Sequence, residues 1–280
     1  MFKLKIETKQ GLLITLTQNE SKYVVTNIEG LNPPQADVFT SAIANMHGGK
    51  YKNSKVQMRN LVITVAIRGD VEENRLELYR IFHSGEYCKI YYENGLRNVY
   101  IEGYAESIES NPFSIAEQMQ ISIICPQPFW VAAKKMIVDI SKEIGAFEFP
   151  FAIESEGIEF SYIELDKVVP IVNYGEIESG IIIRINCYEN GVNNLKIIHE
   201  NKSTYFTIAT TLNNGDEVVI NTKRGQKSIT INGQSAMNVV GLGSTWFSLA
   251  VGDNTFSYSA DSSPEAVAIV FEFEELYEGV

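Results

Sequence analysis

The sequence has little of what most secreted proteins and membrane proteins need. Its 280 residues include three cysteines, Cys88, Cys125 and Cys187, and this odd, widely spaced set is not a disulfide framework. Each lies in an apolar or alternating stretch, which predicts a buried side chain in a protein made in a reducing compartment. No run of about 18 apolar residues could span a membrane, and no apolar run of about 7–15 residues follows the first lysines as in a signal peptide.

Motifs of metal sites and active sites are missing too. None of His47, His83 and His199 has a cysteine, histidine or carboxylate at metal-ligand spacing, and HExxH, paired CxxC and EF-hand sequences are absent. There is no glycine-rich phosphate loop and no Gly-x-Ser-x-Gly elbow. A nucleophile built from Cys88 and His83 stays open, although Cys88 alternates within a predicted strand. We therefore predict a structural or binding protein, not an enzyme, with no catalytic residues, no metal and no cofactor.

Positive charge is in deficit, and the deficit is confined to one half of the chain. The formal net charge is −12, from 23 Lys+Arg and 35 Asp+Glu. Residues 1–145 contain 16 residues of each sign, whereas residues 146–280 contain 7 and 19. Non-specific binding to nucleic acid needs arrays of Lys and Arg, so this acidity argues against it. The shift in composition predicts a first domain at residues 1–130, a connector at 131–145 and a second domain at 146–280.

The first half is predicted to be mainly β with one helix. Alternating apolar residues predict strands such as Phe2–Glu7 and Leu61–Arg68, and an Asn-Gly turn within residues 93–95 predicts a hairpin. Asp70, with Glu73 three residues later, predicts the start of the helix. The helical spacing of Val71, Leu78, Tyr79 and Phe82 predicts that these four side chains share the buried face.

A long polar segment interrupts the strands of this half. The residues from Ser41 to Arg59 are rich in Gly, Asn and Lys and have no apolar period. Such a segment in a compact domain is usually functional or disordered. We predict an arm that protrudes and contacts a partner, and a loop without a role is the alternative. The candidate contact residues are Met46, His47, Gly48, Gly49, Lys50, Tyr51, Lys52 and Asn53.

The second half is predicted to be a β-sandwich. Short strands recur about every ten residues, and turn sequences such as Asn214-Gly215-Asp216 separate them. No internal repeat stands out, which argues against a propeller or a solenoid. The expected strands are Val168–Val172, Ile181–Cys187, Leu195–His199, Tyr205–Ile208, Glu217–Asn221, Ser228–Ile231, Trp246–Val251, Thr255–Ser259 and Val267–Phe273.

Several short motifs follow one another in a distinctive order. In the first half they are Ile28-Glu29-Gly30-Leu31, Arg59 before Leu61–Ile67, Gly69-Asp70, Asn74-Arg75-Leu76, Ile101-Glu102-Gly103-Tyr104, Ser107-Ile108-Glu109 and the stretch from Cys125 to Trp130. In the second half they are Asn173-Tyr174-Gly175, Asn214-Gly215-Asp216 and Gly252-Asp253-Asn254. No single motif is specific. In this order, over nearly the whole chain, they resemble the phage distal tail protein family of long-tailed phages, the siphovirus-type tail components.

The resemblance implies a structural hub of a phage tail tip or baseplate. Members of that family form a ring, usually a hexamer of identical chains, between the tail tube protein above and the tail-associated lysin or hub protein below. The first domain is then a β-sandwich-like belt with one α-helix and a protruding arm, which builds the ring. The second is a galectin-like β-sandwich that projects outward, and in some relatives it carries receptor-binding proteins.

The implied location is the virion tail tip, after synthesis in the host cytoplasm without a signal peptide. DNA passes through the channel of such a ring, and nothing inserts into a membrane. Channel-facing residues are expected to be uncharged or acidic, because a basic lining would hold the DNA. The neutral first half suits surfaces that pack against copies and partners, and like charge on outward domains opposes clumping. A tail-like bacteriocin uses the same part, and the sequence leaves these two particles open.

Two other functions stay open beside this one. The first alternative is a carbohydrate-binding β-sandwich protein that aids adhesion to the host surface. Sugar sites usually need exposed aromatic side chains beside polar groups, and Trp246, Tyr258 and Tyr205 are the candidates. The second alternative is an enzyme, for which the motif search offers no site.

Overall fold

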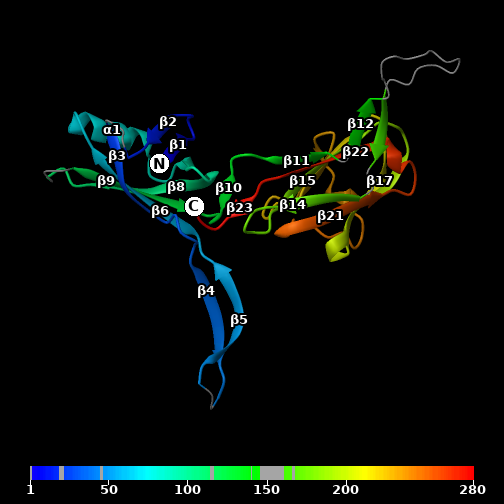
Figure 1. The fold of residues 1–280 in the computed structure, drawn as a ribbon, viewed down its shortest axis with the longest axis horizontal. Helices are drawn as coiled ribbons and strands as arrows, with labels where there is room; N and C mark the ends of the chain where they lie inside the picture. The colour runs from blue at the N-terminus through cyan, green and yellow to red at the C-terminus, as the bar shows by residue number, and fades with distance from the viewer. Residues whose placement is uncertain are drawn as a thin grey trace. The chain divides into compact units, whose positions relative to one another are not determined.

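Seven stretches of the chain are described in the computed structural model: residues 2–18, 22–44, 47–113, 117–139, 141–145, 161–165 and 168–280. They form two units, and both are built mainly of β-strands (Figure 1). Unit 1 consists of residues 1–134 together with Leu276–Val280, and unit 2 of Lys135–Glu275. The prediction of a mainly β protein is confirmed.

Unit 1 is organised around a nine-stranded sheet. Seven of its strands are neighbours in the order β2-β1-β7-β8-β9-β6-β3, while β10 pairs with β8 and β23 pairs with β10. A parallel bridge between Thr17 and Val24 joins the two ends of this order, so the sheet curls toward closure. The strands are β1 (Lys3–Thr8), β2 (Leu13–Leu16), β3 (Tyr23–Glu29), β6 (Arg59–Ile67), β7 (Tyr87–Glu93), β8 (Asn98–Ser110), β9 (Gln118–Cys125), β10 (Trp130–Ala132) and β23 (Leu276–Tyr277).

One face of this sheet and one face of α1 (Val71–Ile81) form the core of unit 1. Every second residue of β6 is buried, as the pleat of a strand requires. The helix begins where it was predicted, because the Asp70 side chain accepts the backbone N–H of Glu73 at 3.3 Å. Its buried face contains Leu78, and Phe82 follows into the core. Tyr79, expected on that face, is exposed instead and lies within 2.8 Å of the Ser110 hydroxyl.

The hairpin predicted around residues 93–95 forms between β7 and β8, but its turn differs from the one expected. Glu93 pairs with Asn98, so residues 94–97 make the loop. The Asn94 side-chain oxygen accepts the backbone N–H groups of Leu96 and Arg97 at 2.9 and 2.7 Å. An asparagine side chain that bonds its own following backbone replaces the two-residue Asn-Gly turn here.

Unit 2 is the predicted galectin-like β-sandwich. A six-stranded sheet has the order β11-β22-β15-β18-β19-β20, and a four-stranded sheet has the order β14-β21-β16-β17. The rings of Phe256 on β21 and Phe271 on β22 lie 5.0 Å apart, which shows side chains of the two sheets meeting in one core. The strands are β11 (Met136–Asp139), β14 (Val168–Asn173), β15 (Ile181–Cys187), β16 (Val192–His199), β17 (Thr204–Leu212), β18 (Glu217–Asn221), β19 (Ser228–Ile231), β20 (Gln234–Ser235), β21 (Gly252–Ser259) and β22 (Val267–Phe273).

Short elements complete unit 2, and one predicted strand is missing. Strands β12 (Ser141–Gly145) and β13 (Ser161–Leu165) form a separate antiparallel pair, and the described 3-10 helices are Glu200–Lys202, Met237–Val239 and Pro264–Ala266. The prediction of a strand at Trp246–Val251 was wrong. Phe247 and Leu249 are buried as their alternation suggested, but this segment pairs through a single bridge, from Leu249 to Ser179. Within the described part of the chain, no helix has the length and hydrophobicity to cross a membrane.

The two units differ from the predicted ranges in two places. Residues 131–145, expected as a connector, contain the end of β10 together with β11 and β12. The last five residues, expected in the second domain, belong to unit 1. There Tyr277 pairs with Trp130, and Arg97 donates a hydrogen bond to the Gly279 carbonyl at 2.6 Å from 182 residues away. Pairing over such a sequence separation leaves no local signal, so the pattern of residues could not reveal it.

Candidate functional site

The predicted arm is a β-hairpin with a sheet of its own. Strands β4 (Ala36–Ala42) and β5 (Gly49–Val56) pair with each other and with no other described strand. Their side chains are exposed except for Ser41 and Val56, which are half-buried. Figure 1 shows the hairpin leading away from the nine-stranded sheet. An isolated two-stranded hairpin buries too little to be stable by itself, so this one depends on its root in unit 1.

One face of the hairpin carries an aromatic ring and hydroxyl groups. Partners across an antiparallel pair lie on the same face, and the register pairs Val38 with Ser54 and Thr40 with Tyr51. The Tyr51 hydroxyl lies 3.0 Å from the Ser54 hydroxyl, which confirms that these two side chains share a face. An exposed face of this kind, with an aromatic ring and hydroxyl groups, is typical of a protein contact surface.

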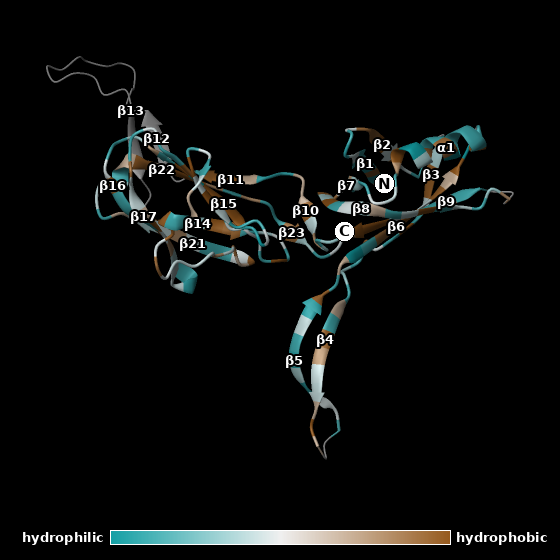
Figure 2. Ribbon diagram, turned by 180° about the vertical axis from the view of Figure 1, so that it is seen from behind, coloured by the Kyte–Doolittle hydropathy of each residue, from teal (hydrophilic) through white to brown (hydrophobic). Residues whose placement is uncertain are grey.

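The opposite face is basic and carries an aromatic ring. The register pairs Asp37 with Lys55, Phe39 with Asn53 and Ser41 with Lys50. A bulge between Phe39 and Thr40 leaves Lys52 as the extra residue on β5. The hairpin therefore holds three lysines against one aspartate in a chain whose net charge is −12. In Figure 2, β4 carries most of the hydrophobic colour of the hairpin and β5 most of the hydrophilic colour.

The structure places the predicted contact residues together at the far end of the arm. His47 and Gly48 lie in the turn, and Gly49 to Asn53 lie on β5, all of them exposed. Met46 lies outside the described residues. The sequence interpretation missed the facing strand, whose exposed apolar side chains are Val38 and Phe39, and Ile43 just beyond it. The available signal was the presence of large apolar residues in a segment without an apolar period.

A buried arginine fixes the root of the arm. Arg59, the first residue of β6, is 3% exposed. Within the described part of the chain, its guanidinium donates to four backbone carbonyl groups, those of Gly30, Asn32, Pro128 and Glu278. The bonds to Pro128 and Asn32 are both 2.7 Å long. Burial lowers the pKa of Arg59, and the ring of Trp130 lies 5.7 Å from the guanidinium carbon. Five N–H donors in one planar group allow a single side chain to bind carbonyl groups of three chain segments.

Gly30 allows this root to close. Its φ is +87°, in the left-handed region, and a Cβ at this position would lie 2.2 Å from the backbone oxygen of Asn60. Only glycine satisfies both conditions. The motifs around Gly30, Arg59 and Trp130, which lie far apart in the sequence, thus meet at the place where the arm leaves unit 1.

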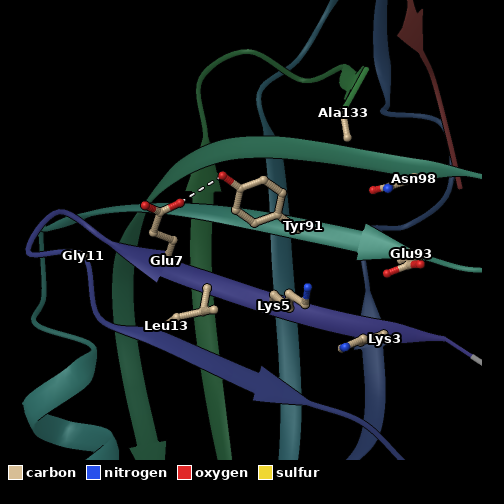
Figure 3. A pocket seen from close by; sticks show the side chains of 9 residues that line it. All are labelled: Lys3, Lys5, Glu7, Gly11, Leu13, Tyr91, Glu93, Asn98 and Ala133. Carbon is tan, nitrogen blue, oxygen red and sulfur yellow. Dashed lines mark hydrogen bonds between the residues drawn. The ribbon is translucent and has the colours of Figure 1, made fainter. Parts of the chain in front are cut away.

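An open depression of about 460 Å³ lies on the outer face of the nine-stranded sheet. Figure 3 shows Lys3, Lys5 and Glu7 of β1 facing Tyr91 and Glu93 of β7 across it. The Tyr91 hydroxyl donates a hydrogen bond to the Glu7 carboxylate at 2.9 Å. Burial raises the pKa of Tyr91, and the hydrogen bond to Glu7 raises it further. The depression is open to solvent, unlike the enclosed pockets that hold small molecules. This depression therefore does not define a ligand site.

The aromatic residues proposed for sugar binding do not form a shared platform. Tyr258 is buried in the core of unit 2. Trp246 is half-buried and packs edge-on against Phe206, with ring centroids 4.9 Å apart. Tyr205 is half-buried, and the Lys196 ammonium covers its ring at 3.9 Å. One of the three is thus buried and the other two are half-buried and packed against Phe206 and Lys196, so these residues do not support the carbohydrate alternative.

The cysteine and histidine residues do not form a reactive pair. Cys88 is buried, and burial raises the pKa of its thiol to about 12, so it is not a thiolate at neutral pH. His83 is exposed. Cys125 and Cys187 are buried thiols as well, with pKa values raised to about 12 and about 11. Among the described residues, no group of three His, Cys, Asp or Glu side chains could hold a metal ion.

One buried polar pair lies in the core of unit 2. His199 Nε2 and Asn254 Oδ1 are 3.1 Å apart, and the His199 ring lies 4.6 Å from the ring of Phe256. Asn254 Oδ1 also accepts the backbone N–H of Ala250 at 2.9 Å, so it acts as an acceptor and His199 Nε2 as a donor. Burial lowers the pKa of His199, and its Nδ1 has no hydrogen-bond partner in the described part of the structure. This pair has a structural role in the sandwich.

Two family models match the sequence, one for each unit. Residues 13–125 match the phage tail protein RIFT-related domain. Residues 174–277 match the C-terminal domain of the siphovirus-type tail component. A search among curated proteins returned no significant match.

Solved structures of phage tail proteins share the fold. The Dit protein of phage SPP1, described as a paradigm of the hub adsorption apparatus in phages that infect Gram-positive bacteria, is 14% identical, with a TM-score of 0.71 and 99% of each chain covered. A chain of the phage P2 baseplate in its activated conformation with calcium is 11% identical, with a TM-score of 0.53 and full coverage of both chains. The corresponding strontium structure gives 12% identity and the same TM-score.

Proposed function

Because this chain belongs to the phage distal tail protein family, a family of phage tail components, we propose that it forms the hub ring at the distal end of a phage tail. Unit 1 builds the ring, as a hexamer of identical copies. The tail tube protein contacts one side of the ring, and the tail-associated lysin or hub protein contacts the other. Unit 2 projects outward and displays its surface, where it carries receptor-binding proteins if the particle has them.

The arm is the single observation that carries this proposal. A solitary monomer gains nothing from a hairpin whose side chains are almost all in water, because ordering it costs conformational entropy without core burial. A closed ring needs contacts between two different patches of neighbouring copies. A hairpin rooted by a buried arginine and exposed along its length is suited to reach such a neighbour. The candidate contact residues are therefore His47, Gly48, Gly49, Lys50, Tyr51, Lys52 and Asn53, together with Met46, which lies outside the described residues.

The distribution of charge supports different tasks for the two units. Unit 1 contains 14 Lys+Arg and 15 Asp+Glu, whereas unit 2 contains 9 and 20. Surfaces that pack against copies of themselves need little net charge, while acidic domains that point outward repel one another and stay apart. The acidic unit is thus the one suited to display, and the neutral unit is the one suited to assembly.

Removing the tip of the arm tests this function. Deletion of residues 44–53 should abolish ring formation by the purified chain, or its addition to a ring on the tail tube protein, while both units still unfold at the parent temperature. Negative-stain imaging and native mass spectrometry report the ring, and calorimetry reports folding. Leu96→Ser, at another exposed turn of unit 1, is the matched control and should assemble normally. Normal assembly of the deletion variant would show that the arm has no part in the ring.

A further inference from the structure

The last five residues of the sequence bind unit 1 beside β10. We call residues 276–280 the clasp. Its strand β23 pairs with β10, and Tyr277 and Val280 pack against the core of unit 1. The Arg97 guanidinium donates a hydrogen bond to the Gly279 carbonyl at 2.6 Å, and its carbon lies 4.2 Å from the centre of the Tyr277 ring. One arginine thus holds the clasp at two points, a backbone carbonyl and an aromatic ring.

The clasp also lies against the residues that lead into the arm. The Val280 backbone N–H donates to the Leu31 carbonyl at 3.2 Å. A Cβ at Gly279 would lie 3.1 Å from the Cδ atom of Pro33 and 3.2 Å from the Leu31 carbonyl oxygen, so these two chain segments are in close contact. Strand β4 begins at Ala36, shortly after this contact. The entry to the arm is therefore bonded to the clasp.

The exit from the arm is bonded to the clasp as well. Strand β5 ends at Val56, and Arg59 opens β6. The Arg59 guanidinium donates to the Glu278 carbonyl of the clasp. The same guanidinium donates to the Gly30 and Asn32 carbonyls at the entry to the arm. Both ends of the hairpin are thus tied to each other and to the clasp.

These bonds decide how firmly the arm is held, because the arm has no core of its own. Nearly all of its side chains are exposed, and a two-stranded hairpin of this kind is marginally stable in water. Its order and its direction therefore depend on what holds its two ends. The clasp is one of the segments that hold them, and it follows all the residues of unit 2 in the sequence.

We propose that the clasp is a positioning segment, which fixes the arm for its contact in the ring only once the chain has been made through residue 280. Domains generally fold in the order of their synthesis, so the rest of unit 1 forms before the clasp exists. Until then both ends of the arm lack their bonds to the clasp, and an unfinished chain carries an arm that is not fixed. Unfinished chains are thereby kept out of growing rings. This inference rests on the proposed ring and adds what makes the arm ready to build it.

Hydrogen exchange of the full chain tests the clasp. Arg97→Gln removes the guanidinium that holds the clasp, in the turn between β7 and β8 and outside the arm. The amides of β4 and β5 should exchange about tenfold faster than in the parent, the change expected for the loss of one hydrogen bond to a charged group. The amides of β7 and β8 should keep the parent rate, whereas a merely structural role would speed exchange there too.

Lys89→Gln is the matched control for this substitution. Lys89 is a half-buried cation on β7 whose ammonium lies 3.7 Å from the centre of the Tyr100 ring, which belongs to the sheet and not to the clasp. The arm of this variant should exchange at the parent rate. Equal acceleration of the arm in Lys89→Gln and Arg97→Gln would overturn the clasp, because any loss of a cation from the sheet would then loosen the arm.

Deletion of residues 276–280 gives an independent readout. The variant should form about tenfold fewer rings than the parent and should stay out of the parent's rings in mixtures, as native mass spectrometry reports. The deletion also removes core contacts, so its unfolding temperature is measured first, and ring formation by Arg97→Gln decides the test if unit 1 no longer folds. Arm amides that exchange at the parent rate in both variants would overturn the clasp and leave the ring function standing. Faster exchange with normal rings would instead contradict the part of the arm in the ring.

Discussion

Unit 1 and unit 2 are both built of β-strands, and each has an apolar core of its own. They differ in the parts of the chain that lie outside the core. In unit 2 the two sheets cover each other, and the surface is acidic. Unit 1 is nearly neutral and extends a hairpin that pairs with none of its other described strands. The difference teaches that burial accounts for the two packed sheets of unit 2, whereas the β4–β5 arm of unit 1 has a conformation that burial within this chain does not explain. Such a segment points to contacts with another molecule.

The two units also bury polar groups in different ways. Unit 1 buries a charged guanidinium that is bonded to four carbonyl groups at the root of the arm. Unit 2 buries a neutral imidazole bonded to an asparagine. A guanidinium keeps its charge over the whole practical pH range, while an imidazole titrates near neutrality. We therefore expect the structure around Arg59 to be insensitive to pH and the core around His199 to respond to acid.

The largest expected effect is a loss of stability in unit 1 that leaves unit 2 unchanged. Arg59→Met should lower the free energy of unfolding of unit 1 by about 3 kcal/mol or more, because four carbonyl groups lose their donor and the arm loses its root. Calorimetry should show the transition of unit 1 at a lower temperature and that of unit 2 unchanged. Arg68→Met, at an exposed arginine, is the matched control. Equal shifts of both transitions would contradict the assignment of Arg59 to unit 1 alone.

A second, smaller effect should appear only in unit 2, and only in acid. The pKa of His199 is lowered in the folded state from its ordinary 6.5, chiefly by burial, with Lys202 adding to the effect and Asn254 and Glu178 opposing it. Below the pKa that His199 has in the unfolded chain, the unfolded chain binds a proton at this residue more readily than the folded chain does. The stabilisation is therefore complete above about pH 6.5 and is lost as the pH falls, at up to about 1.4 kcal/mol for each pH unit.

His199→Gln tests this dependence because glutamine does not titrate. Urea unfolding of the variant between pH 7 and pH 5 should show a shallower loss of stability in unit 2 than the parent shows. His83→Gln, at an exposed histidine, should keep the parent slope. The same slope in the parent and in His199→Gln would mean that another group causes the acid sensitivity.

The smallest expected effect concerns the arm. Tyr51→Ala removes an exposed ring whose one hydrogen bond is to a neighbouring serine of the same strand, so the free energy of unfolding of unit 1 should change by less than about 0.5 kcal/mol. Tyr258→Ala, which removes a buried ring from unit 2, should cost about 3 kcal/mol. Chemical denaturation of both variants gives the comparison. A large loss for Tyr51→Ala would mean that the arm contributes to the fold of its own chain.

Much of the fold was predictable because β-structure leaves a local pattern. The strands Ile181–Cys187, Glu217–Asn221, Ser228–Ile231 and Val267–Phe273 have the predicted bounds, since alternation and turn residues mark both ends. Trp246–Val251 shows where the pattern fails. Its residues alternate because Phe247 and Leu249 are buried, but burial does not require a pairing partner. The prediction that Tyr79 is buried was wrong for a related reason. Helical spacing shows which side of the helix faces the core, but not how wide the buried part of that side is.

The candidate site was predictable in place but not in form. The polar segment showed that something leaves the domain, and the predicted contact residues are exposed there. The pattern did not show that the segment is a hairpin, because its apolar residues lie on β4 and its lysines on β5.

The sequence by itself determined the β class, the two-part division of charge, the start of the helix and the family, because each depends on residue types and short spacings. The tertiary structure decided that the last five residues belong to unit 1 and that Arg59 joins Gly30, Pro128 and Glu278. It also decided that the polar segment pairs with the preceding residues as a hairpin that has two different faces. These features arise from pairing across long stretches of chain, and a backbone carbonyl, which every residue carries, gives no sign in the sequence of which side chain will bind it.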